Sequence, residues 1–220
     1  MKKAAYDKTS RNHTLIKVLG STLLAFFILV SIAGAVPIAD ISNSGNNNIS
    51  NLNTSNEAIK AFDKAIEINP YNSTSWDNKG LNLFMVGKSD EAIKAFDKAI
   101  EINPHDSIGW YGKGLVLTHL NKSDEAIKAS EKAIESDPNN SVAWLGKGLA
   151  LIKFNRSDEA IKALDKAIEL NSQNSVAWTG KGIALAKLGK SHEAIKALDK
   201  AIELNPKDSE ALAIKKKLSK

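Results

Sequence analysis

The 220-residue chain contains no cysteine, only five prolines and few aromatic residues. Without cysteine it cannot form disulfides, use a thiolate nucleophile or bind a metal through sulfur. None of its four histidines has a second ligand at the spacing of a dedicated metal site; they are His13, His105, His119 and His192. We therefore predict no metal and no cofactor.

The chain also has little net charge outside its first residues. Residues 1–36 carry five basic side chains and one acidic side chain, whereas the remainder has 25 basic and 24 acidic residues. A nearly neutral body with interleaved charges provides no field that would attract phosphate backbones. Nucleic acid is therefore excluded as an expected partner.

One long hydrophobic run stands near the N-terminus. Residues 18–36 are nineteen uncharged residues, preceded by a basic stretch and ending in small residues from Ala33. These are the parts of a secretory signal, and the length also approaches the ~20 residues that cross a bilayer. We predict that residues 1–36 are a transmembrane anchor or, alternatively, a cleaved signal peptide. In both cases the basic flank stays in the cytoplasm and the rest of the chain is exported.

Residues 37–56 are rich in asparagine and serine and offer no apolar face, so we expect a linker there. Residues 57–220 differ from it by strict repetition. The only four tryptophans, Trp76, Trp110, Trp144 and Trp178, are spaced 34 residues apart, and the tract 57–70 recurs unchanged as 91–104. A fixed period of this length is typical of a helical-hairpin solenoid.

Each period predicts two helices. In residues 73–86, Trp76, Gly80 and Leu83 lie on one face of a first helix. Gly87, and at the same position later Asn121, Asn155 and Gly189, supply the left-handed residue that ends it. The second helix has an apolar face of small and large residues around Phe96. One such hairpin buries little surface, so neighbours must stack to form a core.

This pattern resembles the tetratricopeptide repeat, whose spaced signature is matched by Trp76, Gly80, Ala92, Phe96, Ala99 and Pro104. The resemblance implies an all-α solenoid with a half repeat at 57–70, full repeats at 73–106, 107–140, 141–174 and 175–208, and a capping helix at 209–219. Three features depart from the family pattern. Ser130 replaces a large core residue, which should loosen the second repeat, and Ser172 replaces a proline, which should lengthen or soften a turn. Lysine occupies a usually aliphatic position at Lys79, Lys113, Lys147 and Lys181, where we expect its ammonium group in water.

The resemblance further implies that the first helices line a concave, largely aliphatic groove that binds a protein or peptide segment. The residues predicted to line it are Phe84, Tyr111, Leu115, His119, Leu145, Leu149, Ile152, Lys153 and Lys187. Of these, Phe84, Tyr111 and Leu145 are expected to be the most exposed. Packing between adjacent first helices is the alternative role for the aliphatic members.

Repetition argues against an enzyme, because a catalytic site needs a unique constellation and these carboxylates and lysines recur in every period. We therefore predict a monomeric, exported interaction scaffold. The alternative is a structural spacer or envelope component that associates with itself through its repeats.

Overall fold

The structure, a computed structural model, describes residues 47–219, all of which lie in the compact unit Ser44–Lys220. The predicted anchor or signal at 18–36 and the first part of the predicted linker lie outside the described residues. Within the described range, no helix combines the length and the apolar character needed to span a bilayer.

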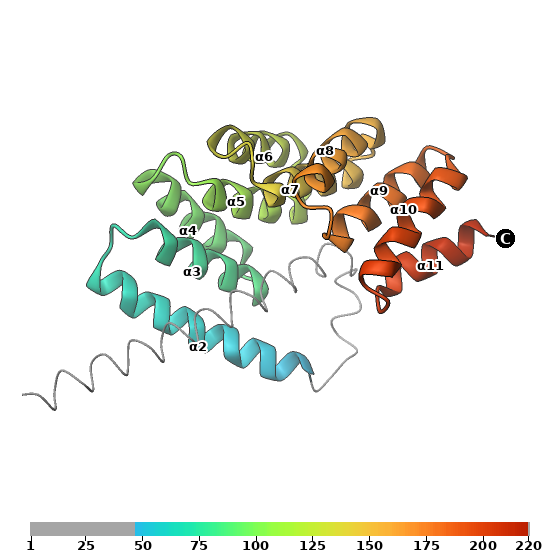
Figure 1. Ribbon diagram of the computed structural model, residues 1–220. Coiled ribbons are helices and arrows are strands. Elements are labelled where there is room, and N and C mark those ends of the chain that lie inside the picture. Colours follow the sequence, from blue (N-terminus) through green and yellow to red (C-terminus); the bar gives the residue numbers. More distant parts are fainter. Residues whose placement is uncertain (1–46, 220) are drawn as a thin grey trace, which may run out of the picture. The chain divides into compact units, whose positions relative to one another are not determined.

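The described residues form an all-α array of antiparallel hairpins (Figure 1). The first helices of the hairpins are α3 (Ser73–Met85), α5 (Ser107–His119), α7 (Ser141–Lys153), α9 (Ser175–Lys187) and α11 (Ser209–Leu218). The second helices are α2 (Asn47–Ile68), α4 (Ser89–Ile102), α6 (Ser123–Ser136), α8 (Ser157–Leu170) and α10 (Ser191–Leu204). The first helices begin at the predicted repeat boundaries.

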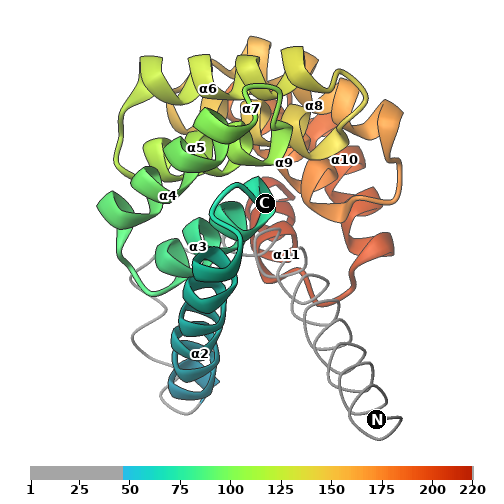
Figure 2. The ribbon, with the colours of Figure 1, turned by 90° about the vertical axis from the view of Figure 1, so that its left-hand side faces the viewer.

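The helix α2 differs from the expected boundary. It begins at Asn47, inside the segment predicted to be a linker, and has 22 residues where the other second helices have 14. No glycine or proline stands between Asn47 and Ile68 to end a helix, and Ser55 contacts Met85 of α3 at 4.0 Å. The second part of the polar tract therefore extends α2 beyond the end of α3 (Figure 2).

Each hairpin turn uses the left-handed residue predicted from the sequence. The φ angle is 80° at Gly87, 61° at Asn121, 59° at Asn155 and 74° at Gly189. Glycine adopts this conformation without steric cost, and asparagine is the side chain that tolerates it best. This prediction is confirmed in all four repeats.

Large side chains of the second helices pack into glycine gaps of the first helices. Phe96 of α4 lies so close to Gly80 and Gly112 that a Cβ at Gly112 would overlap its ring. Leu164 of α8 has the same relation to Gly148 and Gly180, where a Cβ would lie 2.6 Å and 3.2 Å from its side chain. Both large side chains are fully buried, and they join each hairpin to the next.

Every tryptophan secures the turn that precedes its helix. The indole Nε1–H of Trp76, Trp110 and Trp144 donates to the carbonyl oxygen of the proline six residues earlier, at 2.9–3.0 Å. Trp178 makes the same bond, at 2.9 Å, to Ser172. The predicted lengthening of this turn is wrong, because the bond uses a backbone oxygen and α8 ends at the equivalent residue.

The repeated lysines of the first helices link successive hairpins. The ammonium groups of Lys79, Lys113, Lys147 and Lys181 lie 2.6–3.0 Å from carboxylates of the preceding second helix, which are Asp63, Asp97, Glu131 and Asp165. Their side chains are only about a quarter exposed. The expectation that these ammonium groups simply point into water is wrong, since each one bridges to a neighbouring hairpin.

Candidate functional site

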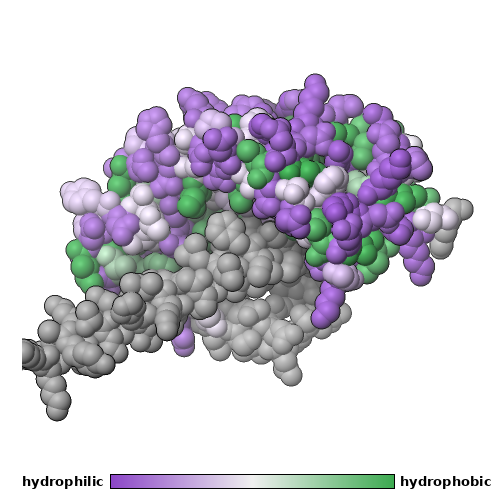
Figure 3. Space-filling model, viewed as in Figure 1, coloured by the Kyte–Doolittle hydropathy of each residue, from purple (hydrophilic) through white to green (hydrophobic). Residues whose placement is uncertain are grey.

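The first helices form the inner side of the array. Successive first helices contact one another, α3 with α5, α5 with α7, α7 with α9 and α9 with α11, whereas the second helices lie outside and pack against the first helices on either side. The face shown in Figure 3 is mostly hydrophilic, with apolar side chains in scattered patches. The inner side is therefore the place to look for a continuous binding surface.

Two predicted groove residues belong to the core. Leu145 is 3% exposed and Ile152 is 8% exposed, and both pack in one cluster with Leu151 and Leu164. The prediction that Leu145 is among the most exposed groove residues is wrong, as is the assignment of Ile152 to the groove. Close contact between adjacent first helices encloses these positions, so the alternative role of inter-helix packing applies to both.

Other predicted residues remain partly accessible on the inner side. Phe84, Tyr111, Leu115, His119 and Leu149 are all half-buried. The rings of Phe84 and His119 meet edge to face with centroids 5.4 Å apart, which joins α3 to α5. Burial, and secondarily the charge of Lys153, lower the pKa of His119.

Sequence reasoning missed one exposed aliphatic residue. Ile108 in the first turn of α5 is 42% exposed, and it lies three and seven residues before Tyr111 and Leu115, on the same helix face. The helical spacing itself was the signal that would have found it. Together, the half-buried or exposed residues Phe84, Ile108, Tyr111, Leu115, His119 and Leu149 make up a surface that we name the inner face.

Tyr111 owes its partial burial to the small residue in the second repeat. Ser130 occupies the position that Phe96 and Leu164 fill in other repeats, and its hydroxyl donates to Ala126 O at 3.0 Å. The tyrosine ring lies against the following first helix instead, where a Cβ at Gly146 would come within 2.7 Å of it. Burial accordingly raises the pKa of Tyr111. The ring thus compensates for Ser130.

The two predicted groove lysines reach back to the preceding first helix. Lys153 Nζ donates to the carbonyl oxygens of Thr118 at 2.6 Å and His119 at 3.3 Å, at the C-terminal end of α5. Lys187 Nζ donates to Ile152 O and to Asn155 Oδ1, both at 2.9 Å, at the end of α7. A cation at a helix C-terminus is favourable, so these lysines stabilise the stack in addition to any role in binding.

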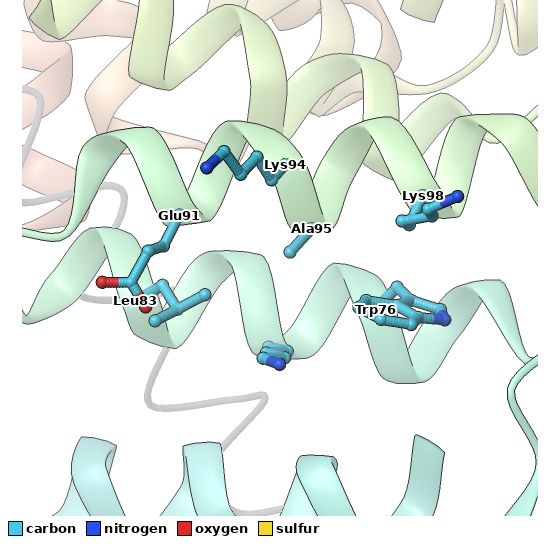
Figure 4. Close-up of a pocket in the computed structure, with 7 residues that line it drawn as sticks. Trp76, Leu83, Glu91, Lys94, Ala95 and Lys98 are labelled. Atoms are coloured by element: carbon cyan, nitrogen blue, oxygen red, sulfur yellow. The ribbon is translucent and has the colours of Figure 1, made fainter. Parts of the chain in front are cut away.

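A shallow hollow on the flank shows what the repeats offer elsewhere. It lies between α3 and α4 and is lined by Trp76, Lys79, Leu83, Glu91, Lys94, Ala95 and Lys98 (Figure 4). Lys79 lies over the Trp76 ring, 5.3 Å from its centroid, and the same pairing recurs at Lys113 with Trp110 and Lys181 with Trp178. Because this lysine–tryptophan pairing recurs with the period of the fold, we interpret it as part of the packing of each hairpin. It gives no single repeat a chemistry of its own.

The described residues hold no group of three or more His, Cys, Asp or Glu side chains that could hold a metal ion. The two described carboxyl groups whose pKa is raised by burial, Asp77 and Glu210, lie at opposite ends of the array, on α3 and α11. The inner face therefore offers an apolar surface for contact with a partner.

Comparison with known proteins agrees with this geometry. A tetratricopeptide-repeat model matches residues 78–141, 120–175 and 145–209, and another model of the same description matches residues 50–72. No curated protein matches the chain.

Several solved structures are similar. YrrB, described as a tetratricopeptide-repeat protein with an unusual peptide-binding site, is 26% identical, with a TM-score of 0.59 over 87% of this chain and 98% of that one. The first such domain of human RPAP3 is 29% identical, with a TM-score of 0.52 over 53% of this chain and 92% of that one.

TTC0263, a protein of Thermus thermophilus, shares the fold at 18% identity, with a TM-score of 0.65 over 78% of this chain and 92% of that one. The matched family models span more than half of the sequence, and the observed hairpins repeat with the same period. The chain belongs to the tetratricopeptide-repeat family.

Proposed function

We propose that this protein is an exported scaffold that binds an apolar peptide segment of another protein along the inner face. The proposal rests on the row of partly accessible aliphatic and aromatic side chains on α3, α5 and α7. These side chains lie next to the buried contacts between adjacent first helices. Exposed apolar patches of this kind mark binding surfaces, and a few such anchors supply most of the binding energy. The described peptide-binding site of YrrB lends support by similarity.

The export part of the proposal rests on residues 18–36, an uncharged run with a basic N-terminal flank. Retained as an anchor, this segment would hold the repeats on the outer side of the membrane; cleaved, it would release them. Protease added to intact cells distinguishes the orientation. Degradation of the repeats with survival of the first seventeen residues supports export, and full protection of the repeats contradicts it.

The binding part is tested with peptides selected from a displayed library on the immobilised full-length chain. Changing Ile108→Glu and Leu115→Glu together should weaken a selected peptide at least about tenfold, because charge replaces two apolar contacts. The matched control is Tyr71→Glu, since Tyr71 is 82% exposed but lies in the turn between α2 and α3. Unchanged binding by a double variant with an unchanged helical spectrum would refute the inner face as the site.

Self-association is a second candidate, favoured by one observation on α2. Ala61 is exposed, whereas the equivalent alanines Ala95, Ala129, Ala163 and Ala197 are 3–4% exposed against their own first helix. A first helix from a second copy would cover Ala61. Sedimentation separates the two candidates: the scaffold proposal predicts a monomer, while a dimer that Ala61→Glu dissociates would favour self-association.

A further inference from the structure

Two carboxyl groups meet in the seam between the first two full repeats. Asp106 precedes α5 and accepts hydrogen bonds from the backbone N–H of Ile108 and Gly109, each at 3.2 Å. Asp77 of α3 packs against the same turn, so that a Cβ at Gly109 would lie 3.0 Å from its Oδ1. Asp77 is 3% exposed and Asp106 is 9% exposed.

The Asp77 carboxyl group is incompletely satisfied where it lies. Its Oδ1 is buried without a hydrogen-bond partner, and the nearest neighbours of that turn on α4 are the apolar side chains of Ala99 and Ile100. Besides burial, the charge of Asp106 and hydrogen bonding between the two side chains raise the pKa of Asp77. Two carboxyl groups can share a hydrogen bond only if one of them carries a proton.

In the later repeats the residue at the position of Asp77 is not acidic. In the fourth repeat Thr179 replaces Asp77, and its hydroxyl donates to Asp208 Oδ2 at 2.7 Å. In the third repeat Leu145 stands at this position, and the helix cap after it is Asn174. The paired acids are therefore a property of the first seam, and the fold does not require them.

We propose that the Asp77–Asp106 pair makes the packing of α3 against α5 depend on pH, holding the first hairpin on the second only while the pair retains a proton. This inference does not depend on the proposed peptide binding. It has a consequence for it, however, because α3 contributes Phe84 to the inner face.

The charged group that acts on Asp77 is Asp106. Of the lysines on α3, α4 and α5, Lys79 is paired with Asp63 and Lys113 with Asp97, each at 2.7 Å, and Lys98 with Glu101. Burial, then the charge of Asp106 and their shared hydrogen bond, raise the pKa of Asp77 from 3.8 to about 8.

The direction of the pH effect follows from this shift. In the folded chain Asp77 keeps its proton up to about pH 8, whereas the unfolded segment loses it near pH 3.8. Between these values the folded state binds more protons, so its stability falls as the pH rises. The seam is tightest in acid and weakest above about pH 8.

Hydrogen–deuterium exchange of the full-length chain in detergent micelles tests the proposal, with rates corrected for the intrinsic effect of pH. Protection of α3 amides should fall between pH 5 and pH 8 by up to about tenfold per unit. The internal control is α7, because its seam pairs Leu145 with Asn174 and should not respond. The α9–α11 seam is a poor control, since burial and Asp208 raise the pKa of Glu210 to about 7.

Two substitutions borrowed from the other repeats complete the test. Asp77→Thr reproduces the Thr179–Asp208 bond and should make α3 protection independent of pH. Asp106→Asn keeps the helix cap, as Asn140 and Asn174 do, and should reduce the fall. A flat α3 profile in the native chain, or an undiminished fall in either variant, would overturn the proposal.

Discussion

The second and third repeats have the same length and the same turn geometry, yet they fill the space between hairpins from different helices. In the third repeat Leu164 of the second helix occupies the glycine gaps at Gly148 and Gly180. In the second repeat Ser130 leaves that space open, and Tyr111 of the first helix covers Gly146.

This difference shows that the burial of a side chain depends on how residues from two neighbouring hairpins fill the space between them. It is not fixed by the position of the residue in the repeat. Positions 111 and 145 are equivalent in the period, but Tyr111 is half-buried and Leu145 is 3% exposed. The expected loosening of the second repeat by Ser130 is thus offset from the opposite helix. Three sets of substitutions test this comparison.

The largest effect is expected for Leu164→Ala, which removes a fully buried side chain between two rigid glycine contacts. It should lower the free energy of unfolding by roughly 2–5 kcal/mol, because the cavity cannot collapse easily. Ser130→Ala is the matched control in the second repeat and should cost less than about 1 kcal/mol. Urea unfolding followed by circular dichroism measures both, and equal losses would contradict the comparison.

An intermediate effect is expected for Ser130→Leu, which installs the third-repeat residue in the second repeat. Overpacking against Tyr111 should cost roughly 1–3 kcal/mol. Adding Tyr111→Leu imitates the third repeat more fully and should recover much of the loss, giving a favourable coupling energy in a double-mutant cycle. Strict additivity of the two changes would mean that Tyr111 and Ser130 do not share one space.

The smallest effect is expected for Lys153→Met, which removes the ammonium group from the C-terminal carbonyls of α5. Since methionine stands at the equivalent Met85, the side chain itself fits, and the loss should be about 0.3–1 kcal/mol. Lys162→Met on the exposed side of α8 serves as the control and should change the urea midpoint little. A midpoint shift of the same size in both variants would remove the special role of Lys153.

The periodic features of this molecule were predictable because each depends on a short stretch of chain. The helix starts at Ser73, Ser107, Ser141 and Ser175 and the left-handed residues at the turns follow from local spacing. By contrast, three features depend on side chains from two repeats that compete for one volume. They are the burial of Leu145, the filling by Tyr111 of the space that Ser130 leaves open, and the contact of Asp77 with Asp106. No pattern within a single period contains that information.

Hydrogen–deuterium exchange with and without a library-selected peptide tests the central claim most directly, since it reports which helices the ligand covers. The account predicts slower exchange in α5 and α7, which carry Ile108, Tyr111, Leu115 and Leu149, and little change in α6 and α8. Slowing confined to α6 and α8, with α5 and α7 unaffected, would place binding on the outer side and contradict the account.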